Sequence, residues 1–115
     1  MIIDNINNIA GKEILNPDAK NAFMKVLVDG KVGWDDYVMR VVEVLEDGYT
    51  PKHKHPWPHI NYVISGDGEI MLEGNYKKVS SGAFAFIPAD KLHQYKNIGK
   101  SIFKFICIVP KEGHK

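Results

Sequence analysis

The sequence of 115 residues has a single cysteine, Cys107, so it can form no internal disulfide. A lone thiol fits a reducing compartment, because disulfide frameworks belong to oxidising ones, and we expect a cytoplasmic location. No apolar stretch approaches the roughly 20 residues that span a bilayer. The first residues also lack the basic-then-apolar pattern of a signal peptide. We therefore expect no membrane partner.

An excess of charge of either sign is missing as well. Fifteen lysines and arginines face fourteen aspartates and glutamates, for a net charge of +1, with no basic run and no acidic tail. Nucleic acid is therefore not an expected partner. A phosphate-binding glycine loop, a nucleophile elbow and a cysteine zinc knuckle are absent too. Hydrophobic residues make up 44% of the chain, enough to bury the core of one domain.

No segment has a convincing helical period. Short apolar runs alternate with turns rich in glycine, asparagine and aspartate, among them Asp47-Gly48 and Pro88-Ala89-Asp90. This spacing predicts an all-β sandwich or barrel. The expected strands cover residues 23–28, 37–45, 50–55, 60–65, 69–73, 76–79, 83–87, 92–96 and 102–109. Residues 1–20 are polar, and we expect an N-terminal arm with little regular structure before a single domain over 21–115.

Four of the five histidines form two clusters, which are His53, His55 and His59, and then His93 on a later expected strand. Residues two apart on a strand share a face, so His53 and His55 present neighbouring imidazoles. Pro56 and Pro58 stiffen the loop to His59, because each proline fixes its own φ and restricts the residue before it. Imidazole is a common metal ligand. The pattern predicts a site for one divalent ion; the alternative is that some are ordinary surface or core histidines.

Two motifs resemble those of the cupins. The first comprises Gly48, His53, His55 and Gly66, and the second comprises Gly82, Pro88, Asp90, His93 and Asn97. The resemblance extends over nearly the whole chain after residue 20. It implies a double-stranded β-helix, or jelly-roll, barrel that is usually dimeric and holds a metal inside its mouth.

The chain departs from the usual cupin motifs at two positions. Most metal cupins place a glutamate four or five residues after the second histidine, where this chain has His59 and Ile60. His59 takes that place, as in a four-histidine subgroup of small cupins, some of which carry manganese. Asp90 replaces a glycine of the second motif, which leaves the turn type open because aspartate tolerates unusual turn conformations.

The metal's identity stays open between Mn, Fe, Ni, Zn and Cu. Imidazole suits zinc, copper, iron and nickel, whereas manganese prefers oxygen ligands, so the ligand chemistry and the resemblance disagree. Four neutral ligands would leave the ion its full charge of +2. Such a site favours an anionic further ligand, for example a carboxylate, an enolate or hydroxide.

Alternation along 102–109 turns Phe105 and Cys107 into the barrel and Lys104 outward. Cys107 is either a small buried core residue or, as the resemblance to the four-histidine cupins implies, a neighbour of the ion and in some states its fifth ligand. Trp57, Tyr95 and Phe105 are candidate pocket walls, although aromatic residues in a barrel are more often plain core. His114, close to the C-terminal end of the sequence, is expected to be solvated.

Arg40 is the one arginine beside fourteen lysines, and it shares a strand face with valines. It has two possible roles. Its planar fork suits a substrate carboxylate, but an ion pair with Glu43 or Asp36 is the ordinary outcome, and we slightly prefer it.

Three functions fit these residues. The first is a non-haem metal oxidoreductase, dioxygenase-like, that acts on a small organic molecule. The second is a non-redox metal isomerase, lyase or cyclase, which needs a general base that the interior does not obviously supply. The third is a non-catalytic cupin that binds a metal or a small ligand. Residues 60–65 and 102–109 are apolar on both faces, so we also expect a homodimer through a sheet that the N-terminal arm extends.

Overall fold

The computed structural model describes residues 1–114 and consists of nine strands with three single turns of 3-10 helix. The strands are β1 (Lys12–Glu13), β2 (Lys20–Val28), β3 (Tyr37–Tyr49), β4 (His59–Ser65), β5 (Gly68–Leu72), β6 (Asn75–Val79), β7 (Phe84–Ile87), β8 (His93–Asn97) and β9 (Phe103–Pro110). The 3-10 turns are η1 (Ile6–Asn8), η2 (Gly30–Val32) and η3 (Lys111–Gly113). The predicted all-β class is confirmed.

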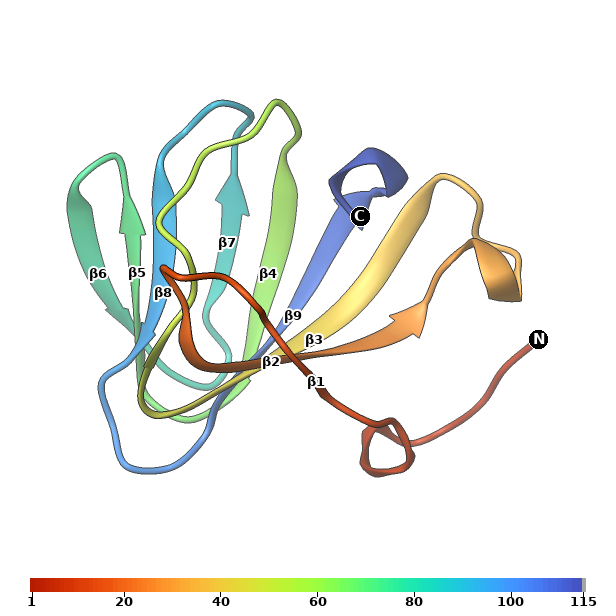
Figure 1. Ribbon diagram of the computed structural model, residues 1–115, viewed down its shortest axis with the longest axis horizontal. Coiled ribbons are helices and arrows are strands. Elements are labelled where there is room, and N and C mark those ends of the chain that lie inside the picture. Colours follow the sequence, from red (N-terminus) through yellow and green to blue (C-terminus); the bar gives the residue numbers. More distant parts are fainter. Residues whose placement is uncertain (115) are drawn as a thin grey trace.

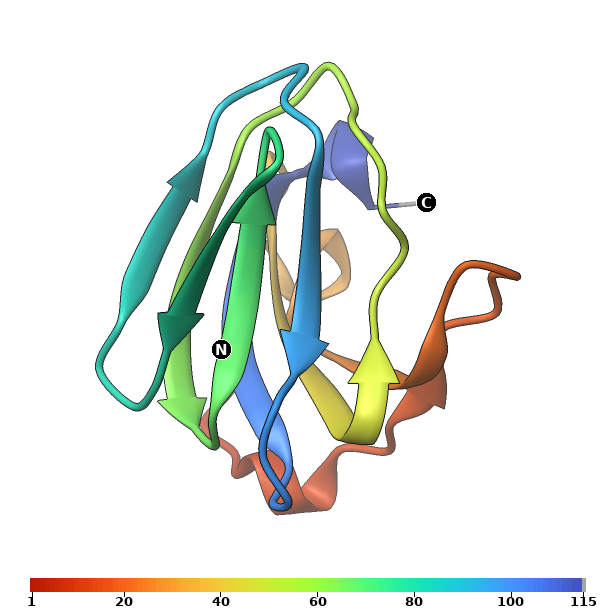
Figure 2. The ribbon, with the colours of Figure 1, turned by 90° about the vertical axis from the view of Figure 1, so that its left-hand side faces the viewer.

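All the strands belong to one antiparallel sheet that curls on itself (Figures 1 and 2). The order is β6-β5-β8-β3-β9-β4-β7, with β2 paired to β3 and β1 to β2. The long strand β3 pairs with β2, β8 and β9, so it connects the two halves of the sheet. From β5 to β7 along this order, every neighbouring pair of strands is non-consecutive in the chain, which is the connectivity of the jelly-roll barrel that the cupin resemblance implies.

The core lies on the concave face of the sheet and is built by strict alternation. On β9 the inward residues Phe103, Phe105, Cys107 and Val109 are all buried, whereas the residues between them are half-exposed. Gly68 leaves the space that the Phe103 ring occupies, since a Cβ at Gly68 would lie only 2.2 Å from that ring. The inward face of β9 therefore supplies both the core and one wall of the interior.

Two expected features of the chain differ in the structure. Residues 50–55 do not form a continuous strand; they run beside β8 and form only an isolated bridge between His53 and His93. Pro51 has no N–H to donate, which interrupts the ladder. The turn expected at Asp47-Gly48 is instead a bend inside β3, where Asp47 is left-handed with φ 65°. A Cβ at Gly48 would lie 2.7 Å from the Lys20 carbonyl oxygen.

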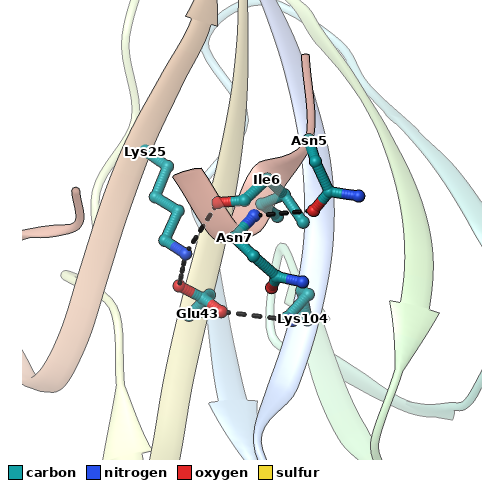
Figure 3. Close-up of polar contacts among 6 residues, drawn as sticks. All are labelled: Asn5, Ile6, Asn7, Lys25, Glu43 and Lys104. Atoms are coloured by element: carbon teal, nitrogen blue, oxygen red, sulfur yellow. Dashed lines mark hydrogen bonds and ion pairs between the residues drawn. The ribbon is translucent and has the colours of Figure 1, made fainter. Parts of the chain in front are cut away.

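The N-terminal segment has more regular structure than predicted. It forms η1 and the two residues of β1, which pair with Met24 and Phe23 of β2. Figure 3 shows how η1 is attached: Lys25 Nζ donates to the Ile6 carbonyl at 3.1 Å and lies 3.4 Å from Glu43 Oε1. On its other side Glu43 pairs with Lys104 at 3.3 Å.

Within residues 1–114, the helices are far too short to cross a membrane.

Candidate metal centre

The structure brings the four predicted histidines together in the mouth of the barrel. His53 and His55 come from the segment between β3 and β4, His59 begins β4 and His93 begins β8. Ligand nitrogens of His53, His55 and His93 all lie within 4.8 Å of one another. His59 Nε2 lies 3.2 Å from His93 Nε2, and both of these side chains are buried.

Backbone hydrogen bonds hold the segment that carries His53 and His55. His53 and His93 exchange N–H···O bonds of 3.1 and 3.0 Å. The Asp90 N–H donates to the His55 carbonyl at 2.7 Å. Asp90 itself is left-handed, with φ 63°, so aspartate adopts the conformation that would otherwise favour glycine. The turn before β8 thus positions both ligand-bearing elements.

Hydrogen bonds also fix which nitrogen of each ring faces inward. Nδ1 of His55 and Nδ1 of His93 lie 2.8 Å from the carbonyl oxygens of Trp57 and Lys91. A carbonyl only accepts, so each Nδ1 carries the hydrogen and each Nε2 keeps its lone pair. The Trp57 ring stacks on His55, with ring centroids 4.7 Å apart and planes 10° apart. These contacts orient the His55 and His93 rings as metal ligands are oriented in proteins.

A second, side-chain network does the same for His59. Its Nδ1 lies 3.3 Å from Tyr95 Oη and 3.6 Å from Cys107 Sγ. The Tyr95 hydroxyl donates to Asn61 Oδ1, so its oxygen is left to accept from the His59 Nδ1–H. Burial is the main cause that raises the pKa of Tyr95 well above its ordinary value, which keeps the hydroxyl protonated.

The lowered pKa values of His53, His59 and His93 favour neutral rings at these three positions. Burial, followed by the neighbouring imidazoles and Arg40, lowers the pKa of His59 to about 3. His53 is exposed on its outer edge but packs against His55 and His93 on its inner side. Desolvation and the same neighbours lower its pKa to about 4. Desolvation also lowers the pKa of His93. The rings can therefore offer lone pairs at neutral pH.

This donor set fits a divalent ion. Two nitrogens at about 2.1 Å from one ion and at right angles to each other are about 3.0 Å apart, close to the 3.2 Å between His59 Nε2 and His93 Nε2. Three histidines are thus placed to bind a metal, with His59 beside them. Imidazole donors alone do not select among zinc, copper, iron and nickel.

A cavity of about 440 Å³ opens beside the histidines. Trp57, Tyr95 and Phe105 line it, as do Arg40 and Cys107. Tyr95 and Phe105 stack with their centroids 4.4 Å apart. A second cavity, of about 450 Å³, lies between β5, β6 and β7; its lining is largely apolar and includes none of the histidines. The first cavity is therefore the one that combines possible metal ligands with an arginine and a thiol.

The ion pair that we preferred for Arg40 is wrong. In the described part of the chain Arg40 has no carboxylate within ion-pair distance, and its Nη2 donates to Cys107 Sγ at 3.2 Å. Glu43 differs from Arg40 in strand parity and therefore lies on the opposite face of β3, between two lysines. Arg40 and Cys107 are also cross-strand partners in the β3–β9 register.

Sequence reasoning missed two parts of the site. Asn61, which orients Tyr95, is buried on β4 two residues after His59, and a polar residue at an inward position was the signal for it. Ile14 and Leu15, from the segment expected to be an arm with little regular structure, line the cavity, and no pattern indicated this. His114 is half-buried rather than fully solvated.

A curled antiparallel sheet that carries three imidazoles close enough to hold one metal ion is the architecture of the small single-domain β-barrels. Residues 40–109 match the family model of the cupin domain, Cupin_2, which is more than half of the chain. The chain therefore belongs to the cupin family.

Two solved structures show the likeness over nearly the full fold. The polyketide cyclase RemF from Streptomyces resistomycificus has a TM-score of 0.89 and 28% identity, covering 96% of this chain and 79% of that one. A structure described as a predicted oxalate decarboxylase from Thermotoga maritima has a TM-score of 0.86 and 18% identity, covering 95% and 98%. The second likeness concerns the fold alone.

A sequence relative from Aquifex aeolicus (strain VF5), described as an uncharacterized protein, is 49% identical over 35 residues. That match spans 30% of this chain and 29% of the relative.

Proposed function

We propose that this chain is a metal-dependent enzyme that binds a small carbonyl- or enol-bearing organic molecule beside one divalent ion. The observation that carries the proposal is the convergence of four imidazoles, three of them oriented by hydrogen bonds, at the edge of a 440 Å³ cavity. His59 is the proposed fourth ligand, because its Nε2 faces that of His93 while Tyr95 and Cys107 contact its Nδ1.

Such an ion supplies a Lewis acid that polarises a substrate oxygen. The chain's own residues orient and enclose the substrate. Met24, Val42 and Phe105 give the cavity apolar walls, which favour a substrate with an apolar body. The Tyr95 hydroxyl, which donates to Asn61, stays neutral and accepts from His59 Nδ1, and it thereby keeps the His59 ring oriented.

A non-redox reaction of the cyclase or isomerase type is the first candidate. Its support is the 28% identity, over 96% of this chain, with a protein named as a polyketide cyclase. This reverses the order that the sequence favoured. A cyclase or isomerase usually needs a general base for proton abstraction, and no aspartate or glutamate of residues 1–114 lines the cavity to supply one. Oxidation therefore stays as the second candidate.

One experiment separates these possibilities. Metal-free protein is reloaded with zinc, manganese or ferrous iron and given a short aryl poly-β-ketone, with and without oxygen. Anaerobic conversion to a product of equal mass, or of that mass less water, supports the cyclase-type reaction; oxygen uptake with manganese or iron supports the oxidoreductase. If the substrate binds saturably but is not converted with any of the metals, with or without oxygen, the proposed enzymatic function is contradicted and a binding protein is favoured. A His93→Ala variant is the matched control.

A further inference from the structure

The Arg40 guanidinium lies in the wall of the histidine cavity without a carboxylate partner. Its one hydrogen-bond acceptor among the side chains and backbone of residues 1–114 is the Cys107 sulfur, at 3.2 Å. Sulfur is a weak acceptor. The Nε atom of Arg40 is buried and has no partner in the described chain. Buried donors in native proteins are nearly always paired, so the guanidinium retains unused donor capacity.

The charges around this cavity all have one sign. Arg40 and Lys54 are the ionised side chains that line it, and no carboxylate of the described residues does so. An arginine stays protonated under all ordinary conditions, and leaving a partly buried charge unpaired is costly. A divalent ion on neutral imidazoles would add to this positive charge rather than offset it. The cavity therefore favours a negatively charged occupant.

We propose that Arg40 binds the carboxylate of a small substrate with an aromatic or apolar body, and so selects organic anions for this cavity. The planar guanidinium matches the two oxygens of a carboxylate, and the apolar walls formed by Ile14, Met24 and Phe105 suit the rest of such a molecule. The inference rests on the proposed function for placing the reacting end of the substrate at the histidines. The contact between Arg40 and the anion does not require the ion.

Because Arg40 is the one arginine in the sequence, protein labelled with ¹⁵N-arginine gives a single Nε–H signal in an NMR spectrum. The probes are benzoate and its neutral isostere benzamide, titrated into metal-free and zinc-loaded wild-type protein. We expect benzoate to shift this signal saturably and to bind about tenfold or more tightly than benzamide in both forms, the equivalent of one charge-assisted hydrogen bond. Equal affinities, or an arginine signal that benzoate leaves unmoved, would overturn the inference.

Variants then assign the preference to the side chain. Arg40→Gln should abolish the preference for benzoate while the zinc content stays at the wild-type level, and Arg40→Lys should retain part of it. Lys54→Gln removes the other cationic residue of the lining, which is exposed, and should weaken the preference far less than Arg40→Gln does. Lys100→Gln, at an exposed lysine outside the lining, is the matched control and should leave the preference intact. If Arg40→Gln does not fold, the titration of the Arg40 Nε–H signal in wild-type protein still tests the proposal. If wild-type protein prefers benzoate over benzamide but converts no substrate with any metal, only the proposed function is refuted. If wild-type protein shows no such preference, only this inference is refuted.

Discussion

In three of the four proposed ligand rings, Nδ1 has a hydrogen-bond partner and Nε2 is left for the ion. His53 is the exception, since its ring has no hydrogen-bond partner among residues 1–114. The partners differ in kind. Backbone carbonyls hold His55 and His93, and a mutation cannot remove them without moving the chain. Side chains hold His59. His59 is therefore the ligand position most open to adjustment by substitution.

Replacing His59 tests whether the site has three or four ligands. We expect His59→Ala to lower metal affinity by at least the roughly 10–100-fold that loss of an outer partner costs, because a buried donor facing His93 is removed. His114→Ala, which alters the histidine outside the cluster, should leave affinity unchanged. Affinity is measured by competition with a chromophoric chelator. Undiminished affinity in His59→Ala would establish a three-histidine site.

The Tyr95 hydroxyl is expected to act on the metal through His59. Tyr95→Phe keeps the ring that stacks on Phe105 but removes the oxygen that contacts His59 and Asn61. We expect metal affinity to fall by about 10–100-fold and the free energy of unfolding by roughly 1–2 kcal/mol, because the buried Asn61 Oδ1 loses the donor that Tyr95 supplies. Metal titration and urea denaturation measure the two effects.

Tyr62→Phe is the control for this experiment, since Tyr62 lies half-exposed on the outer face of the same strand as Asn61. If Tyr95→Phe loses stability but keeps its metal affinity, the hydroxyl has only a structural role.

At the scale of elements, the sequence predicts regular strands better than their irregular ends. The short apolar runs and the turn residues between them locate β4 to β9 within one or two residues, and β4 and β9 also show the period-two burial of a half-buried strand. The strand expected over 50–55 is wrong, because the prediction rests on the apolar and polar pattern, whereas the ladder is interrupted by the backbone N–H that Pro51 lacks. The four histidines were found by spacing, but the roles of Asn61 and Arg40 depend on cross-strand register, which one strand's pattern does not contain.

The N-terminal segment is joined to the sheet by the contacts of Figure 3. Glu43→Gln should loosen η1, because Lys25 and Lys104 then share no carboxylate and Lys25 is free to leave the Ile6 carbonyl. The ion pairs are only partly buried, so we expect a loss of no more than about 1 kcal/mol in stability. The sharper effect is faster hydrogen exchange at the Asn8 and Ile9 amides, which close η1.

Glu46→Gln, a change of an exposed glutamate on the same strand, is the control. Unaltered exchange at both amides in Glu43→Gln would show that η1 is held by packing instead.

At the scale of the whole molecule, the outer face of β4 and β7 is an apolar surface. Cross-strand pairs Ile60–Phe86 and Tyr62–Phe84 lie side by side on it, and all four side chains are about half-exposed or more, with Phe84 at 82%. Ile106 and Ile108 of β9 continue the same face. Contiguous apolar patches of this kind mark contact sites.

We propose that this face pairs two copies of the chain about a two-fold axis, as the two-sided apolar pattern of the strands predicted. The N-terminal β1 pairs with its own β2 within the chain, so the face of β4 and β7 is the simpler route to a dimer. The double variant Tyr62→Lys with Phe84→Lys places like charges on both copies and should give a monomer by light scattering at micromolar concentration.

Tyr76→Lys, at an exposed aromatic residue on β6 outside this surface, should leave the mass of the wild type unchanged. A monomeric wild-type protein would contradict the proposal directly.

The cross-strand register also fixes the order in which the site can be assembled. His53 and His93 meet only through a bridge between distant parts of the chain, and β3 pairs residue 37 with residue 110 across the sheet. Such non-local pairing makes closure of the barrel the slow event in folding. The histidines are not gathered before closure, so a metal ion has no complete site to enter until the sheet has formed. We therefore expect the ion to be acquired by an already folded barrel, and its entry rate to report on the opening of the cavity rather than on chain folding.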